Sequence, residues 1–366
     1  MSENAIQQNF GNIVFTNNLL ENLKSLAYKF STVVVLVDEK IHHLYQDVKN
    51  IFSSETQKKI LFLKITASEA FKTRETKEYL ENEMLDNNCC KDTFLICIGG
   101  GIISDIGGFL AATYCRGIPF VIVPTTLLAM VDASIGGKNG VNTDKGKNLI
   151  GTIYKPKHIF IDTNFLKTLP KKEIINGVVE MIKHGIVDSY FHFASLETNA
   201  SSVLEGKLSL LENLIQESCA IKVKISSEDT IDEGKRHLLN FGHTIGHALE
   251  HYFDYQITHG EAVAIGILVE SYLALLLNLI DSETLERIFT LFKNYQLPLK
   301  LPSKVPFEDL YHCMLMDKKS KNGRPRFILI KDIGDVHVVQ NEFCHFVEKK
   351  LIVQAVHWMN YDLCRD

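Results

Sequence analysis

The sequence predicts an α/β fold that is followed by a helical region. In the first half, short β-branched runs alternate with helical patterns, which is typical of a mainly parallel sheet covered on both faces. After Thr168-Leu169-Pro170 the chain consists mostly of long helical patterns, and proline commonly begins helices and interrupts other structure. We therefore expect an α/β domain at residues 1–169 and an all-helical domain at residues 170–366.

Four apolar runs in the first half are the expected strands. They look continuously apolar because both faces of such a sheet are buried. They are Thr32–Asp38, Ile60–Ile65, Thr93–Ile98 and Phe120–Pro124. Helical patterns are expected at Lys77–Leu85, Ile106–Tyr114, Ile174–Val187 and Leu208–Ser226. The stretch Ala262–Ile280 has nearly the length of a membrane span, but Glu270, Ser271 and Asn278 within it favour a buried core helix.

Length and composition limit the possible classes of protein. The 366 residues suit two domains of ordinary size, and 46% apolar with 23% charged residues is ordinary for a soluble globular protein. The net charge of −5 provides no basic field for nucleic acid. The eight cysteines form no C-x-x-C pair, and no apolar signal peptide is visible at the N-terminus. We expect no nucleic-acid partner, no membrane association and a cytoplasmic location.

Three histidines and a glutamate stand close together within apolar sequence in the second half. His243 and His247 are four residues apart and would share one face of a helix, while His259 and Glu261 open a second helical segment. Neutral imidazoles are common zinc ligands, and catalytic zinc sites use three protein ligands and an open position. The alternative is ordinary histidines in packed helices. The residues favour a metal site without deciding which of the four bind the ion.

Further polar side chains are expected near this motif. Arg236 and Asn240 precede the first two histidines at spacings of four and three, so a cation, an amide and two imidazoles would line one helical stripe. Glu180 and Lys183 stand in another apolar helical pattern. They are either an ordinary i,i+3 ion pair or a buried pair in which a metal would give Glu180 a partner.

A glycine-rich turn at Gly99–Asp105 follows an apolar strand and leads into a helical pattern. Glycines there would let a pyrophosphate approach the backbone and the helix N-terminus. The spacing matches the dinucleotide fingerprint only in part, because Ser104 occupies the third glycine position, and Asp38 could bind a ribose instead. For this turn alone, a tight strand-to-helix connection is an equally good interpretation.

A second polar segment, residues 131–151, lies between apolar flanks and is expected to be a binding loop. Its glycines permit left-handed backbone, and Lys138, Lys147 and Asn148 supply donors suited to phosphate oxygens. A solvated loop with surface lysines is the alternative.

Together, many separated motifs in order resemble the 3-dehydroquinate synthase family of the sugar phosphate cyclase superfamily, from about residue 38 to about residue 334. The matching motifs are Gly99–Asp105, Tyr114–Gly117, Pro124–Ala129, Ser134–Lys138, Gly146–Gly151, Glu180–Gly185, Asn240–His247, His259–Ala262 and Asp317–Lys319. The resemblance implies a Rossmann-like N-terminal domain, a helical C-terminal domain, and NAD and substrate bound between them.

The resemblance also assigns residues. It implies Zn²⁺ or Co²⁺ held by Glu180, His243 and His259, with His247 as a substrate-side group in place of a ligand. The positions that match the NAD site are Asp38, Glu69, Lys72, Gly100, Gly101, Asp105, Thr125, Thr126, Asp132, Lys138 and Lys147. The positions that match the catalytic and substrate pocket are Arg116, Asp132, Lys138, Asn148, Lys183, Lys222, Arg236, Asn240 and His247, with Lys318 or Lys319 as a further cation.

Within that pocket the resemblance also implies which group of the substrate each side chain would contact. Lys138, Asn148 and His247 would contact the phosphate region. Lys222 and Arg236 would suit the substrate carboxylate, since a guanidinium fork matches carboxylate geometry. The position of Arg116 matches an arginine that reaches the phosphate site of the neighbouring subunit, which implies a homodimer.

The implied reaction belongs to the shikimate pathway of aromatic amino acid biosynthesis. It converts 3-deoxy-D-arabino-heptulosonate 7-phosphate to 3-dehydroquinate and phosphate by oxidation with NAD, phosphate elimination, reduction, ring opening and aldol closure. One alternative is another sugar phosphate cyclase, whose substrate without a carboxylate would not need Lys222 and Arg236. A metal-dependent alcohol or glycerol dehydrogenase would release NADH. An inactive binding protein would be expected to have lost a ligand or a lysine.

Overall fold

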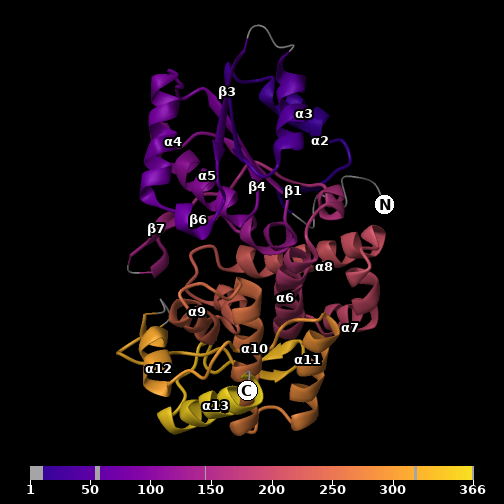
Figure 1. Cartoon of the computed structure of the whole chain (residues 1–366), viewed down its shortest axis with the longest axis vertical. Coiled ribbons are helices and arrows are strands. Elements are labelled where there is room, and N and C mark those ends of the chain that lie inside the picture. Colours follow the sequence, from indigo (N-terminus) through magenta and orange to yellow (C-terminus); the bar gives the residue numbers. More distant parts are fainter. Residues whose placement is uncertain (1–10, 54–57, 145, 317–319, 365–366) are drawn as a thin grey trace. The chain divides into compact units, whose positions relative to one another are not determined.

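The computed structural model describes residues 11–53, 58–144, 146–316 and 320–364. The chain forms two compact units, Met1–Leu169 and Pro170–Asp366 (Figure 1). The division falls at the point where the sequence changes from alternating strands and helices to long helices.

Unit 1 is built on a six-stranded sheet in which all neighbouring strands are parallel. In spatial order β1-β8-β5-β4-β2-β3, the strands are β1 (Ile13–Phe15), β8 (Ile159–Ile161), β5 (Phe120–Pro124), β4 (Thr93–Gly99), β2 (Thr32–Asp38) and β3 (Lys59–Ile65). From β2 the chain continues outward to β3, then returns to β4 on the other side of β2. The order therefore reverses between β2 and β4, the kind of point at which open α/β sheets bind ligands.

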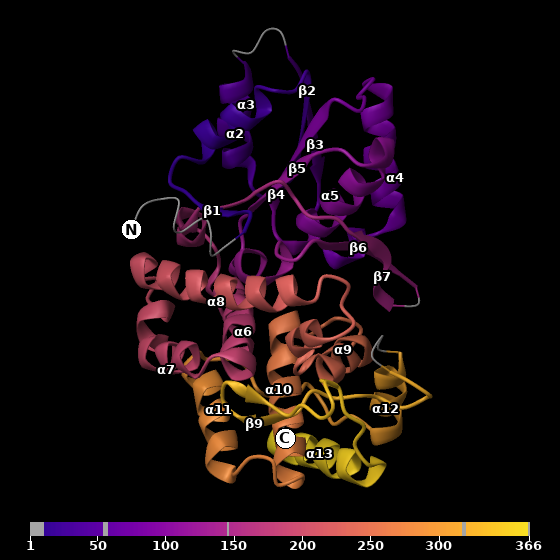
Figure 2. The same ribbon diagram turned by 180° about the vertical axis from the view of Figure 1, so that it is seen from behind.

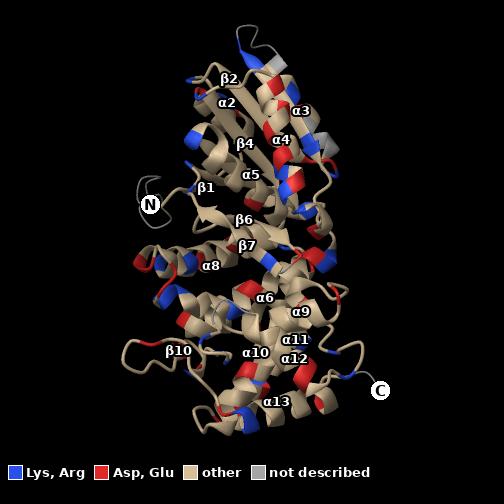
Figure 3. Cartoon of the chain, turned by 90° about the vertical axis from the view of Figure 1, so that its left-hand side faces the viewer, with Lys and Arg blue, Asp and Glu red and all other residues tan. Residues whose placement is uncertain are grey.

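Helices cover both faces of this sheet (Figure 1). The helices of unit 1 are α2 (Leu19–Ala27), α3 (His42–Ser53), α4 (Arg74–Asp86) and α5 (Gly101–Thr113). Val34 and Leu36 of β2 pack in a core with α4 and α5, whereas Val33 and Val35 pack in a second core with α2 and α3. Strand β2 is apolar throughout because both of its faces are buried. In Figure 3 acidic and basic residues are interspersed on the helices, and β2 and β4 are almost free of charge.

The four expected strands are confirmed to within one residue at either end. Strands β1 and β8 were not predicted, because three residues are too short to show a pattern. The expectation of a simple loop at residues 131–151 is wrong. Most of that segment forms an antiparallel hairpin of β6 (Lys138–Thr143) and β7 (Gly146–Ile153), in which Gly140 faces Gly151. Paired glycines allow the strands to approach closely, and they also hide the strand pattern in the sequence.

Unit 2 consists mainly of helices. Its described residues also include a small antiparallel ribbon, β9 (Ile330–Asp332) and β10 (Asp335–Val336), and isolated β-bridges such as Phe327 with His345, none of which the sequence predicted. Its helices are α6 (Lys171–Asp188), α7 (Tyr190–Leu204), α8 (Leu208–Glu228), α9 (His243–Tyr252), α10 (His259–Leu276), α11 (Ser282–Asn294), α12 (Phe307–Leu315) and α13 (Lys349–Asp362). Helix α10 lies among α6, α9, α11 and α13 (Figure 2).

Helix α10 is the apolar stretch that approaches the length of a membrane span. Among the described residues it alone is long and apolar enough to cross a membrane, and 72% of its apolar window is buried inside the protein. Burial on all sides explains why it lacks a polar face, so its composition is that of a core helix.

The prediction of one helix that carries residues 236–247 is wrong. Lys235–Asn240 forms a short 3₁₀ helix, Phe241 is extended, and Gly242 has a left-handed φ of 78° before α9 begins at His243. A β-carbon on Gly242 would lie 2.7 Å from the backbone nitrogen of Ile267 in α10. The chain therefore turns here to bring α9 against α10, and only glycine fits that turn.

Candidate active site

The close packing of α9 on α10 is made by glycines. A β-carbon on Gly246 would lie 3.1 Å from Val263 Cα, and one on Gly266 would lie 1.9 Å from the carbonyl oxygen of Gly242. Each of these contacts is with backbone atoms, which cannot move aside independently. The two helices therefore hold their N-terminal histidines at a fixed separation.

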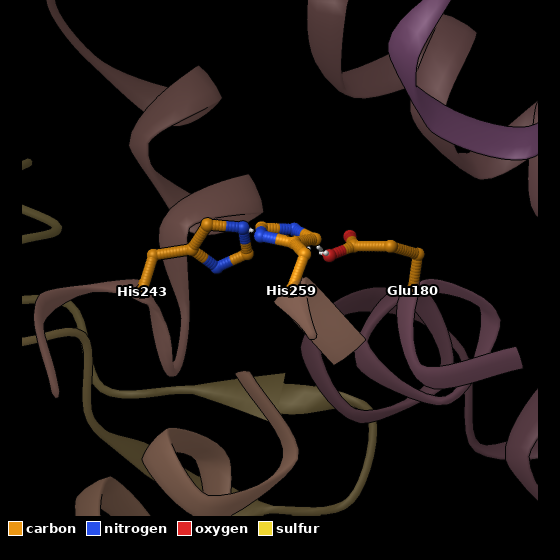
Figure 4. Close-up of side chains that lie close together, drawn as sticks. All are labelled: Glu180, His243 and His259. Carbon is orange, nitrogen blue, oxygen red and sulfur yellow. Dashed lines mark ion pairs between the residues drawn. The ribbon is translucent and has the colours of Figure 1, made fainter. Parts of the chain in front are cut away.

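Three side chains from separate segments converge beside these helices: Glu180 of α6, His243 of α9 and His259 of α10 (Figure 4). Glu180 Oε1 lies 3.5 Å from His243 Nε2 and 3.4 Å from His259 Nε2. One ligand atom from each residue lies within 4.8 Å of the other two. Two imidazole nitrogens and one carboxylate oxygen at this spacing are a donor set that suits a zinc-like ion.

His243 is held as a neutral imidazole. Burial, followed by the nearby Lys183, keeps the pKa of His243 well below its usual range. Its Nδ1 lies 3.0 Å from the carbonyl oxygen of Phe241, so Nδ1 donates and Nε2 is left with its lone pair toward Glu180. The arrangement therefore prepares Nε2 for a metal.

His259 stands between two carboxylates. Burial acts to lower the pKa of His259, but Glu250 and Glu180 outweigh burial and raise the pKa to about 10. Its Nδ1 lies 3.5 Å from Glu250 Oε2 on α9. Glu250 is a residue that the sequence interpretation missed, although it follows His243 by seven positions and so shares its helix face.

Glu261 is not part of the cluster, which corrects the first interpretation of the motif. Its carboxylate accepts hydrogen bonds from the backbone N–H and the hydroxyl of Thr258, at 2.6 and 2.7 Å, and it forms a capping box at the start of α10. The role of this glutamate is thus to fix the helix end that carries His259.

His247 lies beside the cluster and outside its donor set. Its ring centroid is 5.2 Å from that of His243 and 6.3 Å from that of His259, and the side chain is exposed. The donor set that includes His243 is completed by Glu180 and His259, and it does not include His247.

Three predicted cations lie buried in unit 2. Lys183 pairs with Glu180, and Lys222 and Arg236 are 6% and 2% exposed. They come from α6, α8 and the 3₁₀ helix that ends at Asn240, and these three elements pack against one another. Buried cations of this kind suit an anionic ligand.

Asp229 shapes the turn that leads to Arg236. Its carboxylate accepts hydrogen bonds from the backbone N–H groups of Glu233, Gly234 and Arg236, at 3.2, 2.7 and 3.1 Å. Burial opposes ionisation, but these hydrogen bonds outweigh it and lower the pKa of Asp229 below its usual range. Sequence interpretation did not single out this residue.

We expect Asp229→Asn to lower the free energy of unfolding at neutral pH by roughly 1–2 kcal/mol, because an amide oxygen is a weaker acceptor than a carboxylate. A lowered pKa means that the carboxylate stabilises the fold above the unfolded-state pKa and ceases to do so as pH falls through the folded-state pKa. The difference from wild type should therefore shrink toward about pH 3. Urea unfolding of both proteins at the two pH values measures it, and an equal difference at both would contradict the assignment.

In unit 1, five of the predicted cofactor residues follow adjacent strands at the carboxyl edge of the sheet. Asp38 ends β2, Gly100 and Gly101 follow β4, and Thr125 and Thr126 follow β5. Gly100 caps the N-terminus of α5, and its Cβ position is only 3.3 Å from the Thr126 side chain. Such an edge, with a helix N-terminus and a bare backbone, suits a pyrophosphate.

A second group of predicted residues in unit 1 forms one polar network. Lys72, which is 4% exposed, donates to Asp105 Oδ2 at 2.5 Å and to Asn148 Oδ1 at 2.6 Å. Lys147 Nζ lies 3.8 Å from Glu69 Oε2. The network joins the segment before α4, helix α5 and the hairpin.

The remaining predicted positions of unit 1 are more scattered. Asp132 is half-buried in a π-helical turn, Ala129–Ala133, and Lys138 is exposed at the start of β6. Arg116 is exposed, with a left-handed φ of 59°. Lys318 and Lys319 lie outside the described residues.

Family models for the 3-dehydroquinate synthase N-terminal and C-terminal regions match residues 62–176 and 177–320. The 3-dehydroquinate synthase of Thermoanaerobacter pseudethanolicus is 41% identical over 330 residues, which cover 89% of this chain and 92% of the relative. The chain belongs to the 3-dehydroquinate synthase family. It is an enzyme of the carbon–oxygen lyase class, a phosphate-eliminating cyclase.

Solved structures of other sugar phosphate cyclases share the fold of this family member. The 2-epi-5-epi-valiolone synthase of Streptomyces hygroscopicus, solved with NAD⁺ and Zn²⁺, is 26% identical with a TM-score of 0.85, over 95% of this chain and 96% of its own. A 2-deoxy-scyllo-inosose synthase, solved with carbaglucose-6-phosphate, NAD⁺ and Co²⁺, is 24% identical with a TM-score of 0.83, over 94% and 95%.

Proposed function

We propose that this chain converts 3-deoxy-D-arabino-heptulosonate 7-phosphate to 3-dehydroquinate and phosphate, with NAD and a divalent metal ion, zinc or cobalt. The observation that carries the proposal is the convergence of Glu180, His243 and His259 in a chain of this family. Relatives with the same fold hold NAD⁺ together with Zn²⁺ or Co²⁺, which supports the pair of cofactors.

Unit 2 would supply the metal ligands, and unit 1 would supply the residues that bind NAD. Glu180, His243 and His259 would hold the metal and leave a position for the substrate. When bound, the metal would acidify a substrate hydroxyl, and NAD would take up and return a hydride. The carboxyl edge of the unit 1 sheet would bind the NAD pyrophosphate, with Asp38 as the ribose partner.

The buried cations of unit 2 would bind the substrate's negative groups. Arg236 and Lys222 suit the carboxylate, and His247, exposed beside the cluster, suits the phosphate region. In unit 1, Lys138 and Asn148 are donors of the kind that bind phosphate oxygens. A substrate without a carboxylate would make no use of these two cations. The retention of both cations therefore favours this substrate over that of a sister cyclase.

Replacement of Arg236 by Lys is expected to raise KM by about 10- to 100-fold, because an ammonium cannot form the bidentate contact. Metal content should be unchanged. Lys235→Arg is the matched control, since this neighbouring lysine pairs with Glu228 at 2.6 Å. Steady-state kinetics and metal analysis measure both effects, and an unchanged KM for Arg236→Lys would remove Arg236 from carboxylate binding.

The proposed reaction is tested by turnover of metal-loaded enzyme with 3-deoxy-D-arabino-heptulosonate 7-phosphate and a catalytic amount of NAD. Many phosphates released per NAD, with product of the mass of 3-dehydroquinate, support the proposal. Stoichiometric NADH without phosphate would indicate a dehydrogenase. No reaction would favour a sister substrate or an inactive binding protein.

Two finer features belong to the same proposal. The exposed, left-handed Arg116 is assigned to the phosphate site of a second subunit, so the active form would be a homodimer. The enzyme is assigned to the cytoplasm, where its eight free cysteines would stay reduced.

A further inference from the structure

Glu250 is a buried carboxylate that the reaction described above does not use. It lies on α9, two turns after His243, and is 2% exposed. A carboxylate so deeply buried is costly unless a positive or hydrogen-bonding partner compensates it. The side chain that it faces on the neighbouring helix is His259, whose Nδ1 is 3.5 Å from Glu250 Oε2.

We propose that Glu250 is a positioning residue for the metal: its carboxylate is the acceptor toward which Nδ1–H of His259 points, so that Nε2 of that ring is presented to the ion. The inference rests on the proposed metal site. The geometry on the two sides of the ring supports it, because Nε2 points to Glu180 Oε1 at 3.4 Å while Nδ1 points to Glu250. An acceptor on one ring nitrogen decides which nitrogen is free to bind a metal, and a carboxylate acceptor also makes that nitrogen more basic.

The two histidine ligands are thereby supported differently. His243 donates a hydrogen bond from Nδ1–H to the backbone carbonyl oxygen of Phe241, whereas His259 faces a carboxylate. Glu250 belongs to the helix of the other ligand, so its contact ties α9 to the start of α10. A second buried carboxylate works in the opposite direction: Glu270 of α10 accepts the backbone N–H of Gly242, directly before His243, at 3.0 Å. Each helix therefore braces the ligand on its neighbour.

The competing interpretation is that Glu250 only stabilises the packing of two helices. A carboxylate–histidine pair outside the site serves as a control in unit 2. Glu217 of α8, which is itself exposed, lies 2.9 Å from Nδ1 of the buried His192, and neither residue belongs to the metal cluster. Replacement of Glu217 therefore removes a carboxylate–histidine contact without touching the proposed site.

The experiment measures the dissociation constant of Zn²⁺ by chelator competition, and the visible absorption of the Co²⁺-loaded protein, for wild type, Glu250→Gln and Glu217→Gln. Glu250→Gln is expected to weaken Zn²⁺ binding by about 10- to 100-fold and to change the Co²⁺ spectrum, whereas Glu217→Gln should leave both unchanged. Glu250→Asp keeps the charge, so its Zn²⁺ affinity should lie between those of wild type and Glu250→Gln. This variant replaces Glu250→Gln in the comparison if Glu250→Gln does not fold.

The outcomes separate the two interpretations. An unchanged affinity in Glu250→Gln, or equal losses in Glu250→Gln and Glu217→Gln, would overturn the positioning role. If wild type itself bound no stoichiometric Zn²⁺, the proposed metal site would fall first, and with it this inference.

Discussion

His243→Ala is expected to abolish stoichiometric metal binding and to lower turnover by more than about 1,000-fold, whereas His247→Ala should keep its metal. The reason is geometric. His243 Nε2 faces Glu180 Oε1 within the cluster, and His247 lies outside that donor set on an exposed position of the same helix. Loss of one of three ligands leaves too few donors to hold zinc, and a catalytic metal supplies several kcal/mol of transition-state stabilisation.

Each variant is incubated with excess Zn²⁺, unbound ion is removed by gel filtration, and metal analysis of the protein then measures this difference directly. His247→Ala serves as the matched control, because it removes the same imidazole one helical turn away. His247→Ala should still lose activity through weaker substrate binding. Equal loss of metal from both variants would restore the i,i+4 histidine pair as the ligands and would displace Glu180 or His259 from the set.

The second large effect is expected from Gly266→Ala in α10. The new β-carbon would lie 1.9 Å from the carbonyl oxygen of Gly242 and 2.9 Å from the backbone nitrogen of Gly246. Both atoms belong to backbone, so α9 must move away from α10. We expect a loss of unfolding free energy of roughly 3 kcal/mol or more, together with loss of metal binding, because His243 moves with α9.

Urea unfolding with metal titration measures both consequences. Gly206→Ala is the control in the same unit. Gly206 has a left-handed φ of 76°, and nothing lies within 4 Å of its Cβ position. It should cost only about 1–2 kcal/mol for the backbone conformation and leave metal binding intact. If Gly266→Ala were no more destabilising than Gly206→Ala, the contact at Gly266 would not determine how closely α9 packs against α10.

The parts of the fold that sequence predicts are those with a strong local pattern. Strands β2, β4 and β5 are buried on both faces and read as unbroken apolar runs. Strands β1 and β8 have three residues each, and their membership of the sheet depends on partners far along the chain. The turn at Gly242 is set by the approach of α10, a contact that no local spacing reports.

The candidate site divides in the same way. Spacing identifies His243 and His247 as neighbours on a helix, but Glu180 stands more than 60 residues earlier. Its apolar surroundings suggested a buried carboxylate in need of a partner, and the family resemblance joined it to the two histidine ligands. The role of Glu261 was readable, since a Thr three residues before a Glu is the signature of a capping box. Glu250 and Glu270 act across a helix pair, and their partners became apparent only with the packing of α9 on α10.

His243 and His259 are each the first residue of a helix. The positive ends of two helix dipoles are therefore directed at the cluster, about half an elementary charge each before screening. This field opposes the binding of a bare cation, and the negative charge of the buried Glu180 carboxylate offsets that opposition. The same field favours an oxygen atom that gains negative charge during a reaction. Electrostatically, the start of the two helices would therefore favour the alkoxide form of a bound alcohol.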